Sequence, residues 1–209
     1  MLDNNGFDMW SAGYDESVDI TDYDNEYPFA GYKKIMNAIY GTIMAKCPCE
    51  ILDIGIGTGT LSAKLYDGGN NITGVDFSSK MLETAKAKMP NSKLMQFDFT
   101  KGLPPELVGS KFDFIVSTYA LHHLTDDEKV AFIKSLLSHT NEAGTIIIGD
   151  VSFQSRDDME KCKEQCGDEW DDDEFYFVFS ELKNKLETVC KLSYHQFSYC
   201  GGVMEISSL

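Results

Sequence analysis

The sequence contains no apolar run that approaches the roughly 20 residues needed to cross a bilayer. Its first residues have neither the basic region nor the apolar region of a secretory signal. Both absences predict a cytoplasmic protein with no membrane partner. No internal repeat and no low-complexity linker divides the 209 residues, so we expect a single domain with one sizeable core.

Basic residues are scarce, with 18 Lys and Arg against 34 Asp and Glu and a formal net charge of −16. This charge repels phosphate backbones and anionic lipids, so it argues against nucleic acid as a partner. Residues 1–31 hold eight acids and no Lys or Arg, and residues 168–174 hold six acids in seven positions. Solvated surface is the default interpretation of both stretches. The alternative is that they border a binding site and favour an amine or another cationic ligand.

The six cysteines lack the standard spacing of a zinc site, both in Cys47-Pro-Cys49 and in the pair Cys162 and Cys166. In the cytosol they are expected to be reduced thiols. Cys162 and Cys166 can share one helix face and would then supply half of a metal site, but plain thiols are the favoured interpretation. We therefore predict no metal centre.

Apolar, β-branched stretches alternate with helical patterns between residues 49 and 152, which predicts a parallel sheet with helices on both faces. The expected strands cover residues 50–54, 72–76, 112–118 and 145–151, with a further strand ending just before Asp98. Thr125 and Glu128 form a capping-box pattern, and Ser78 or Ser79 can cap another helix.

Both flanks of this core also show periodic patterns. Before it, apolar residues at helical spacing predict a helix over residues 32–43. After it, we expect a charged helix over 155–167, a stronger amphipathic helix over 175–189, and a hairpin of strands 192–199 and 203–207 around Gly201-Gly202. The single domain thus divides into an aromatic, acidic arm with a helix (1–46), a core (47–152) and C-terminal helices with a hairpin (153–209).

Residues 51–61 form an apolar strand that runs into a glycine-rich turn and a new helix. Gly55, Gly57 and Gly59 are spaced G-x-G-x-G, and Thr60 stands where the dinucleotide fingerprint G-x-G-x-x-G has its last glycine. The turn therefore suits a nucleotide-like ligand that has no pyrophosphate.

Acidic side chains stand in or after three of the expected strands. Asp53 lies inside the first strand and needs partners, which the amides of the glycine loop can supply. Asp76 closes the second strand, and Asp98 follows the third. In an open α/β sheet, ligands bind outside the carboxyl ends of the strands, so these positions point to one site. For Asp98 the alternative is a loop aspartate that caps its own turn.

The fourth strand leads into Tyr119, His122 and His123, and Asp150 closes the fifth. By the same rule these four residues are the candidate catalytic groups. A histidine here can deprotonate a substrate because its pKa is ordinarily near neutrality. Packing or shaping of the loop is the alternative role.

The glycine turn resembles motif I of class I S-adenosylmethionine (AdoMet) methyltransferases, and the whole chain is similar to the bacterial YrrT-like group of that family. The resemblance rests on residues 7–15, the glycine turn, the acids Asp76 and Asp98, residues 117–127 and the closing hairpin. It implies a Rossmann-like α/β fold with a mostly parallel seven-stranded sheet and a C-terminal antiparallel hairpin. It also implies a set of AdoMet contacts, namely Trp10, Tyr14, Asp53, Gly55, Gly57, Gly59, Asp76, Phe77, Met81, Asp98, Phe99 and Tyr119.

The function favoured by the resemblance is methyl transfer from AdoMet to a small-molecule acceptor by direct displacement, which yields S-adenosylhomocysteine. A non-catalytic AdoMet sensor or assembly partner is the alternative. A NAD-dependent oxidoreductase is disfavoured by Thr60 and by the hairpin. The sequence leaves the acceptor unnamed and the oligomeric state open between monomer and homodimer.

Overall fold

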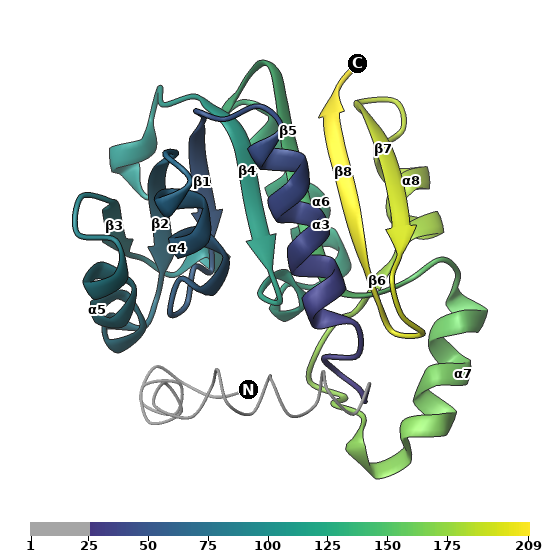
Figure 1. Cartoon of the computed structure of the whole chain (residues 1–209). Helices are drawn as coiled ribbons and strands as arrows, with labels where there is room; N and C mark the ends of the chain where they lie inside the picture. Colours follow the sequence, from purple (N-terminus) through teal and green to yellow (C-terminus); the bar gives the residue numbers. More distant parts are fainter. Residues whose placement is uncertain (1–25) are drawn as a thin grey trace.

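The computed structural model describes residues 26–209. Within them, seven strands pair in the order β3-β2-β1-β4-β5-β8-β7, and the short strand β6 pairs with β5 beside this path (Figure 1). The strands are β1 (Glu50–Ile54), β2 (Asn71–Asp76), β3 (Lys93–Gln96), β4 (Phe112–Thr118), β5 (Thr140–Phe153), β6 (Phe177–Val178), β7 (Cys190–Gln196) and β8 (Gly201–Ser208). The predicted Rossmann-like sheet is confirmed.

Most neighbouring strands are parallel, and the exception is β8, which runs antiparallel to both β5 and β7. The carboxyl ends of β1, β2 and β4 therefore meet along one edge of the sheet, the lower edge in Figure 1. An edge of this kind is where open α/β sheets bind their ligands.

Helices cover both faces of the sheet, with α3 and α4 in front of it and α6 and α8 behind it in Figure 1. The strands alternate their side chains between two cores: Ile51 packs with the buried residues of α3 and α4, and Leu52 packs with those of α6 and α8. The helices are α3 (Tyr32–Met44), α4 (Thr60–Asp67), α5 (Ser79–Lys88), α6 (Asp126–Leu137), α7 (Arg156–Cys166) and α8 (Phe179–Leu186). Four 3₁₀ turns join them: η1 (Phe99–Lys101), η2 (Pro105–Leu107), η3 (Leu121–His123) and η4 (Gly167–Glu169).

The predicted helix caps are present. Thr125 and Glu128 form a full capping box at the start of α6, and the hydroxyl of Ser78 accepts from the amide of Met81 at the start of α5. Of the two serines considered, Ser78 is thus the cap. No helix within residues 26–209 is both long and apolar enough to span a bilayer.

The prediction of one helix over residues 175–189 is wrong at both ends. Phe177 and Val178 form β6, which pairs with Ser152 and Phe153 of β5, and α8 begins only at Phe179. The helix ends at Leu186. A short apolar run is compatible with either structure, and the edge of β5 selects the strand here.

The predicted hairpin is present with a different turn. Gly201 and Gly202 are the first residues of β8 and pair with β5, so they are not the turn. The turn lies over residues 197–200, where the amides of Phe197 and Ser198 donate to the carbonyl of Gly201. A Cβ on Gly202 would lie 2.5 Å from the ring of Tyr194, so this glycine is required by close packing between the strands.

Candidate functional site

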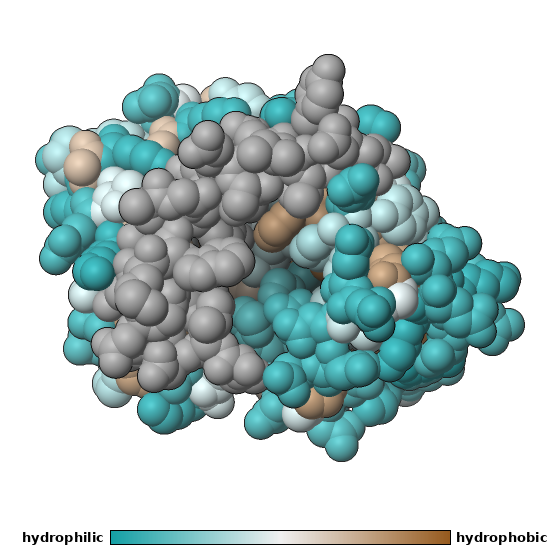
Figure 2. Space-filling model, turned by 90° about the horizontal axis from the view of Figure 1, so that it is seen from below, coloured by the Kyte–Doolittle hydropathy of each residue, from teal (hydrophilic) through white to brown (hydrophobic). Residues whose placement is uncertain are grey.

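A cleft lies at the carboxyl ends of β1, β2 and β4, and Figure 2 shows a hollow in this face of the molecule. It encloses about 740 Å³ of empty space, including the part open to solvent. Its walls combine a glycine loop, two buried acids and several apolar and aromatic side chains. The lining residues are Tyr32, Met36, Asp53, Gly55, Ile56, Gly57, Thr58, Thr60, Leu61, Asp76, Phe77, Met81, Phe99, Thr118, Tyr119, Ala120 and His123.

The glycine loop after β1 is held by backbone hydrogen bonds, because the amides of Gly55 and Ile56 both donate to the carbonyl of Val75. Gly57 has a φ of +54°, a conformation that disfavours residues with a Cβ. A Cβ on Gly57 would meet no atom of residues 26–209 within 4 Å, so this part of the protein leaves space beside the backbone there. The loop therefore leaves room for a ligand to approach its main chain closely.

Asp76 ties the loop to the end of β2. One carboxylate oxygen accepts from the amide of Gly57 at 2.8 Å, and the other accepts from the amide of Ser78 at 2.9 Å. These two bonds fix the carboxylate in the wall of the cleft. A carboxylate held in this way is already oriented, so contact with a ligand would cost little further side-chain freedom.

Asp53 is a buried acid with one engaged oxygen. The hydroxyl of Ser62 in α4 donates to Oδ2 at 2.5 Å, and Oδ1 has no hydrogen-bond partner among the described residues. Burial, opposed by the bond from Ser62 and aided by the nearby Asp76, raises the pKa of Asp53 to about 7. The loop amides that were expected as its partners donate elsewhere, since that of Gly57 binds Asp76.

Among the predicted cofactor residues that the structure describes, Asp98 and Gly59 do not line the cleft. Asp98 caps η1, where Oδ1 accepts from the amide and the hydroxyl of Thr100 and Oδ2 lies 3.0 Å from the ammonium of Lys101. Gly59 is the N-cap of α4, and a Cβ there would lie 2.8 Å from Cε of Met89. Asp98 thus caps its own turn, which was the alternative interpretation of this residue. Its predicted contact with the adenine stays a prediction.

An aromatic cluster closes the side of the cleft below α3. Tyr119 has a φ of +50°, the one positive value among the described non-glycine residues. Its ring lies 5.2 Å from that of Phe29 and 5.3 Å from that of Tyr32, measured between centroids. A backbone of this kind costs of order 1–3 kcal/mol and is most often found at ligand-binding sites.

The four candidate catalytic residues separate into two groups. Tyr119 and His123 line the cleft, whereas His122 and Asp150 lie buried behind it as a pair, with Nδ1 of His122 2.6 Å from Oδ1 of Asp150. Burial lowers the pKa of His122, but the carboxylates of Asp150 and Glu174 outweigh burial and raise it overall. Burial and the neighbouring His122 together lower the pKa of His123 to about 4, so this ring is neutral at neutral pH.

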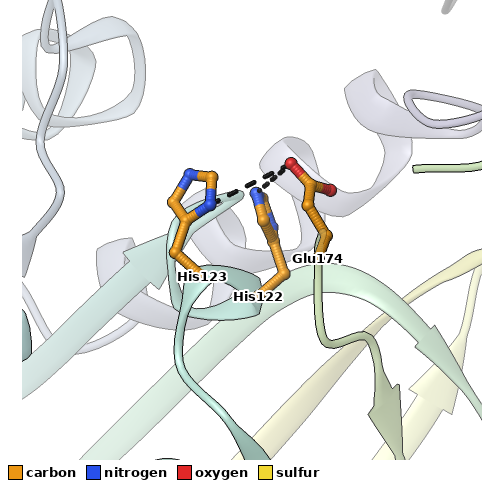
Figure 3. Close-up of side chains that lie close together, drawn as sticks. All are labelled: His122, His123 and Glu174. Atoms are coloured by element: carbon orange, nitrogen blue, oxygen red, sulfur yellow. Dashed lines mark ion pairs between the residues drawn. The ribbon is translucent and has the colours of Figure 1, made fainter. Parts of the chain in front are cut away.

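Glu174 was not singled out by the sequence. It comes from the acidic segment 168–174, and its Oε1 lies 3.4 Å from Nε2 of His122 and 4.0 Å from Nδ1 of His123 (Figure 3). One end of this segment therefore reaches the histidines of the site. Tyr32 and Met36 of the cleft wall were also missed, because their spacing indicated only a helix that packs on the sheet.

The predicted aromatic arm is described only from residue 26 onward, so Trp10 and Tyr14 lie outside the described residues. Tyr27, at the end of the arm, stacks on Trp170 at 5.5 Å between ring centroids, and its hydroxyl is hydrogen-bonded to that of Tyr176. This part of the arm is packed against the acidic segment.

Comparison with known proteins decides the family. Residues 51–144 match a family model described as a methyltransferase domain. An uncharacterised methyltransferase of Geobacillus sp. (strain WCH70) is 35% identical over 163 residues, which cover 76% of this chain and 72% of that relative. The chain belongs to the class I AdoMet-dependent methyltransferases. AdoMet is thus the cofactor of this methyltransferase, as the resemblance of its glycine turn implied.

Solved structures share the fold of the methyltransferase at low sequence identity. The complex of DhpI with S-adenosylhomocysteine aligns with a TM-score of 0.72 and 17% identity over 98% of this chain and 94% of that chain. An AdoMet-dependent methyltransferase from Clostridium acetobutylicum ATCC 824 aligns with a TM-score of 0.70 and 17% identity over 93% and 98%. These likenesses support the class I fold of the methyltransferase.

Proposed function

We propose that this methyltransferase transfers the methyl group of AdoMet to a small-molecule acceptor by direct displacement. The observation that supports the proposal best is the cleft, in which two buried carboxylates, an open glycine backbone and an aromatic wall surround one space of about 740 Å³. When bound, AdoMet supplies an electrophilic methyl group: the acceptor's lone pair bonds to the methyl carbon, the carbon–sulfur bond breaks toward sulfur, and S-adenosylhomocysteine remains.

The residues that line the cleft fit the parts of this cofactor. Asp53 has an oxygen without a hydrogen-bond partner in the described part of the chain, and the ammonium group of the methionine part is a suitable donor for it. Asp76, already fixed by two amides, suits the ribose diol. The open backbone of Gly57 gives the room for close approach, and Phe77, Met81 and Phe99 supply apolar surface for the adenine.

On the acceptor side, the chain's contribution is to position the acceptor and to exclude water. Tyr119 is held by Phe29 and Tyr32, and His123 stands beside it in the wall. Well-oriented reactants alone can recover roughly 7–11 kcal/mol of a barrier, so no single indispensable base is needed. By the family resemblance, Trp10 and Tyr14 of the arm add a cover over the cleft.

An amine or another cation is the acceptor class that the charge distribution favours. Glu174 brings the acidic segment 168–174 to His122 and His123. A local excess of carboxylates raises the concentration of cations at the mouth of a cleft. We expect the reaction to take place in the cytoplasm, with the protein as a monomer or a homodimer.

The experiment that tests the function incubates the full chain with AdoMet labelled on its methyl group and with fractionated metabolite extract. The expected result is label in a small molecule, with S-adenosylhomocysteine formed in equal amount. Label in protein or nucleic acid would contradict a small-molecule acceptor, and an anionic labelled product would contradict the cationic class. Protein with Asp76→Ala is the control, because its cofactor site is impaired.

A further inference from the structure

Two histidines and a carboxylate converge beside the wall of the cleft (Figure 3). His122 and His123 end the 3₁₀ turn η3, and Glu174 precedes β6. One possible ligand atom from each residue lies within 4.8 Å of the other two. Ligands placed about 2.1 Å from a tetrahedral ion are about 3.4 Å apart. The separation of Nε2 of His122 and Oε1 of Glu174 is 3.4 Å, which equals that value, and the separation of Nδ1 of His123 and the same oxygen is 4.0 Å, so a small shift of the side chains would complete the geometry.

The hydrogen bond to Asp150 determines which nitrogen of His122 faces the cluster. A carboxylate only accepts hydrogen bonds, so Nδ1 of His122, 2.6 Å from Oδ1 of Asp150, carries a proton. In the neutral ring, Nε2 then presents its lone pair to Oε1 of Glu174. A lone pair and a carboxylate oxygen at this distance repel each other, so the arrangement needs positive charge between them, which either a proton on Nε2 or a metal ion can supply.

Asp150 is placed as the outer partner of a metal-binding histidine would be. It is fully buried, and the amide of Val151 donates to the same Oδ1 at 2.8 Å, which fixes the carboxylate. Histidines that bind metals generally donate their second ring N–H to a carboxylate or carbonyl, which sets the tautomer and orients the ring. The ammonium of the buried Lys129 is bonded to the carbonyl of Phe175 and to Asp126.

We infer that His122, His123 and Glu174 form a binding site for a divalent transition-metal ion, with Asp150 as the positioning residue. Two imidazoles and one carboxylate are a ligand set of catalytic zinc sites and of non-haem iron(II) sites, both of which keep an open coordination position, and Zn²⁺ is the redox-inert ion of the two. Because His123 also lines the cleft, the ion lies next to the acceptor side, where a donor atom of the acceptor can take the open position. The site goes beyond the proposed function, since it can exist without methyl transfer.

The test uses the full chain, freed of metal with a chelator and without AdoMet. Co²⁺ is titrated and followed by visible absorption, and Zn²⁺ binding is measured by calorimetry. We expect one ion per chain, with the d–d bands of a nitrogen and oxygen site and no thiolate charge-transfer band. Mg²⁺ prefers all-oxygen ligands and should not bind this set.

Variants separate this site from adventitious binding. Asp150→Asn alters the residue that positions His122 and should weaken Zn²⁺ binding by roughly 10- to 100-fold. Glu174→Gln keeps the shape of the side chain but removes the charge of a ligand, so it should weaken Zn²⁺ binding by more than that. Two matched controls should leave the affinity unchanged: Asp173→Asn removes a neighbouring exposed charge, and His195→Asn removes an exposed imidazole on β7. Circular dichroism checks that each variant is folded.

Three results would overturn the inference: no binding, a thiolate band that assigns the ion to the cysteines, or an affinity that Glu174→Gln leaves unchanged. In that case a proton on Nε2 of His122, and not a metal ion, lies between His122 and Glu174. Neither Glu174 nor Asp150 lines the cleft, so AdoMet binding by these variants should match that of the unaltered protein. A failed metal site with intact AdoMet binding thus leaves the proposed function standing, whereas unaltered protein that does not bind AdoMet contradicts the function itself.

Discussion

Asp53 combines full burial with a titratable group, so its protonation contributes to stability. Its folded-state pKa of about 7 is raised above the ordinary value near 4, so the folded protein holds a proton that the unfolded chain releases. The resulting stabilisation is fully present below about pH 4 and is lost as the pH rises through about 7. Between these limits the free energy of unfolding should fall by up to about 4 kcal/mol relative to Asp53→Asn. Urea unfolding of both proteins at pH 5 and pH 8 measures it, and parallel pH dependences would contradict the burial argument.

The same residue predicts a pH dependence of cofactor binding. An ammonium group beside Asp53 favours its ionised form, so AdoMet binding should release a proton when the pH is below about 7. Calorimetry of AdoMet binding at pH 6.5, in two buffers that differ in ionisation enthalpy, measures the protons released. Asp53→Asn should lose this component of the release. Identical proton release by the two proteins would show that Asp53 does not contact the ammonium.

Substitutions at Gly57 and Asp76 should impair AdoMet binding without unfolding the protein. Gly57→Val places a side chain in the open space beside the loop and should eliminate AdoMet binding in a folded protein. The matched control is Gly109→Val, also at positive φ with open space around it but outside the cleft. Asp76→Ala should weaken binding by roughly 1.5–3 kcal/mol, the range of a charge-assisted hydrogen bond. Calorimetry measures all three, and unchanged affinity in Gly57→Val and Asp76→Ala would refute the assignment of the cleft.

At the scale of elements, the sequence predicted the parts whose signals are local. The limits of β1 and β4 and the caps of α5 and α6 depend on neighbouring residues, and they were predicted correctly. The strand β6 was missed because an apolar pair becomes a strand only when another edge is available, here that of β5. A contact between segments far apart in the sequence leaves no periodic pattern of residues from which it could be predicted.

The site shows the same division. The cleft residues within the glycine turn and at the end of β2 were identified because one motif fixes their geometry over a few residues. Glu174 meets His122 and His123 from some fifty positions away, and no pattern among the acids of segment 168–174 distinguishes it from its neighbours. The carboxylate of Asp98 accepts hydrogen bonds from its own turn, and these bonds compete with any ligand for the same oxygen. Short polar side chains often bond to the nearby backbone in this way.

The arm before α3 supports a prediction about lid function. Its described end, Tyr27, packs against Trp170 and Tyr176 as part of the core that contains Ile51, and a deletion that stops at residue 26 keeps this contact. Deletion of residues 1–26 should therefore lower methyl transfer more than it lowers the free energy of unfolding. Transfer to the identified acceptor and urea unfolding are compared for the full and shortened chains, with Trp10→Ala and Tyr14→Ala as single changes. A shortened chain with full turnover would show that the arm is not a lid.

For the whole molecule, cofactor binding should appear as a shift of the melting temperature. A ligand at 100 times its dissociation constant adds about 2.7 kcal/mol to the stability of the folded state. In a domain of this size each kcal/mol raises the melting temperature by roughly 2–4 °C. AdoMet and S-adenosylhomocysteine should therefore each raise it by roughly 5–11 °C under these conditions.

The melting experiment also distinguishes the kind of nucleotide site. NAD carries a pyrophosphate that needs the helix N-terminus after a G-x-G-x-x-G turn, and here Thr60 stands at the last position of that pattern. NAD at the same concentration should leave the melting temperature unchanged, and Gly57→Val should lose the shift with AdoMet while Gly109→Val keeps it. A shift with NAD as large as that with AdoMet would mean that the cleft does not select against the dinucleotide, which contradicts the reading of the turn. Because both ligands contain adenosine, the difference between the two shifts measures what the loop and Asp53 recognise beyond the nucleoside.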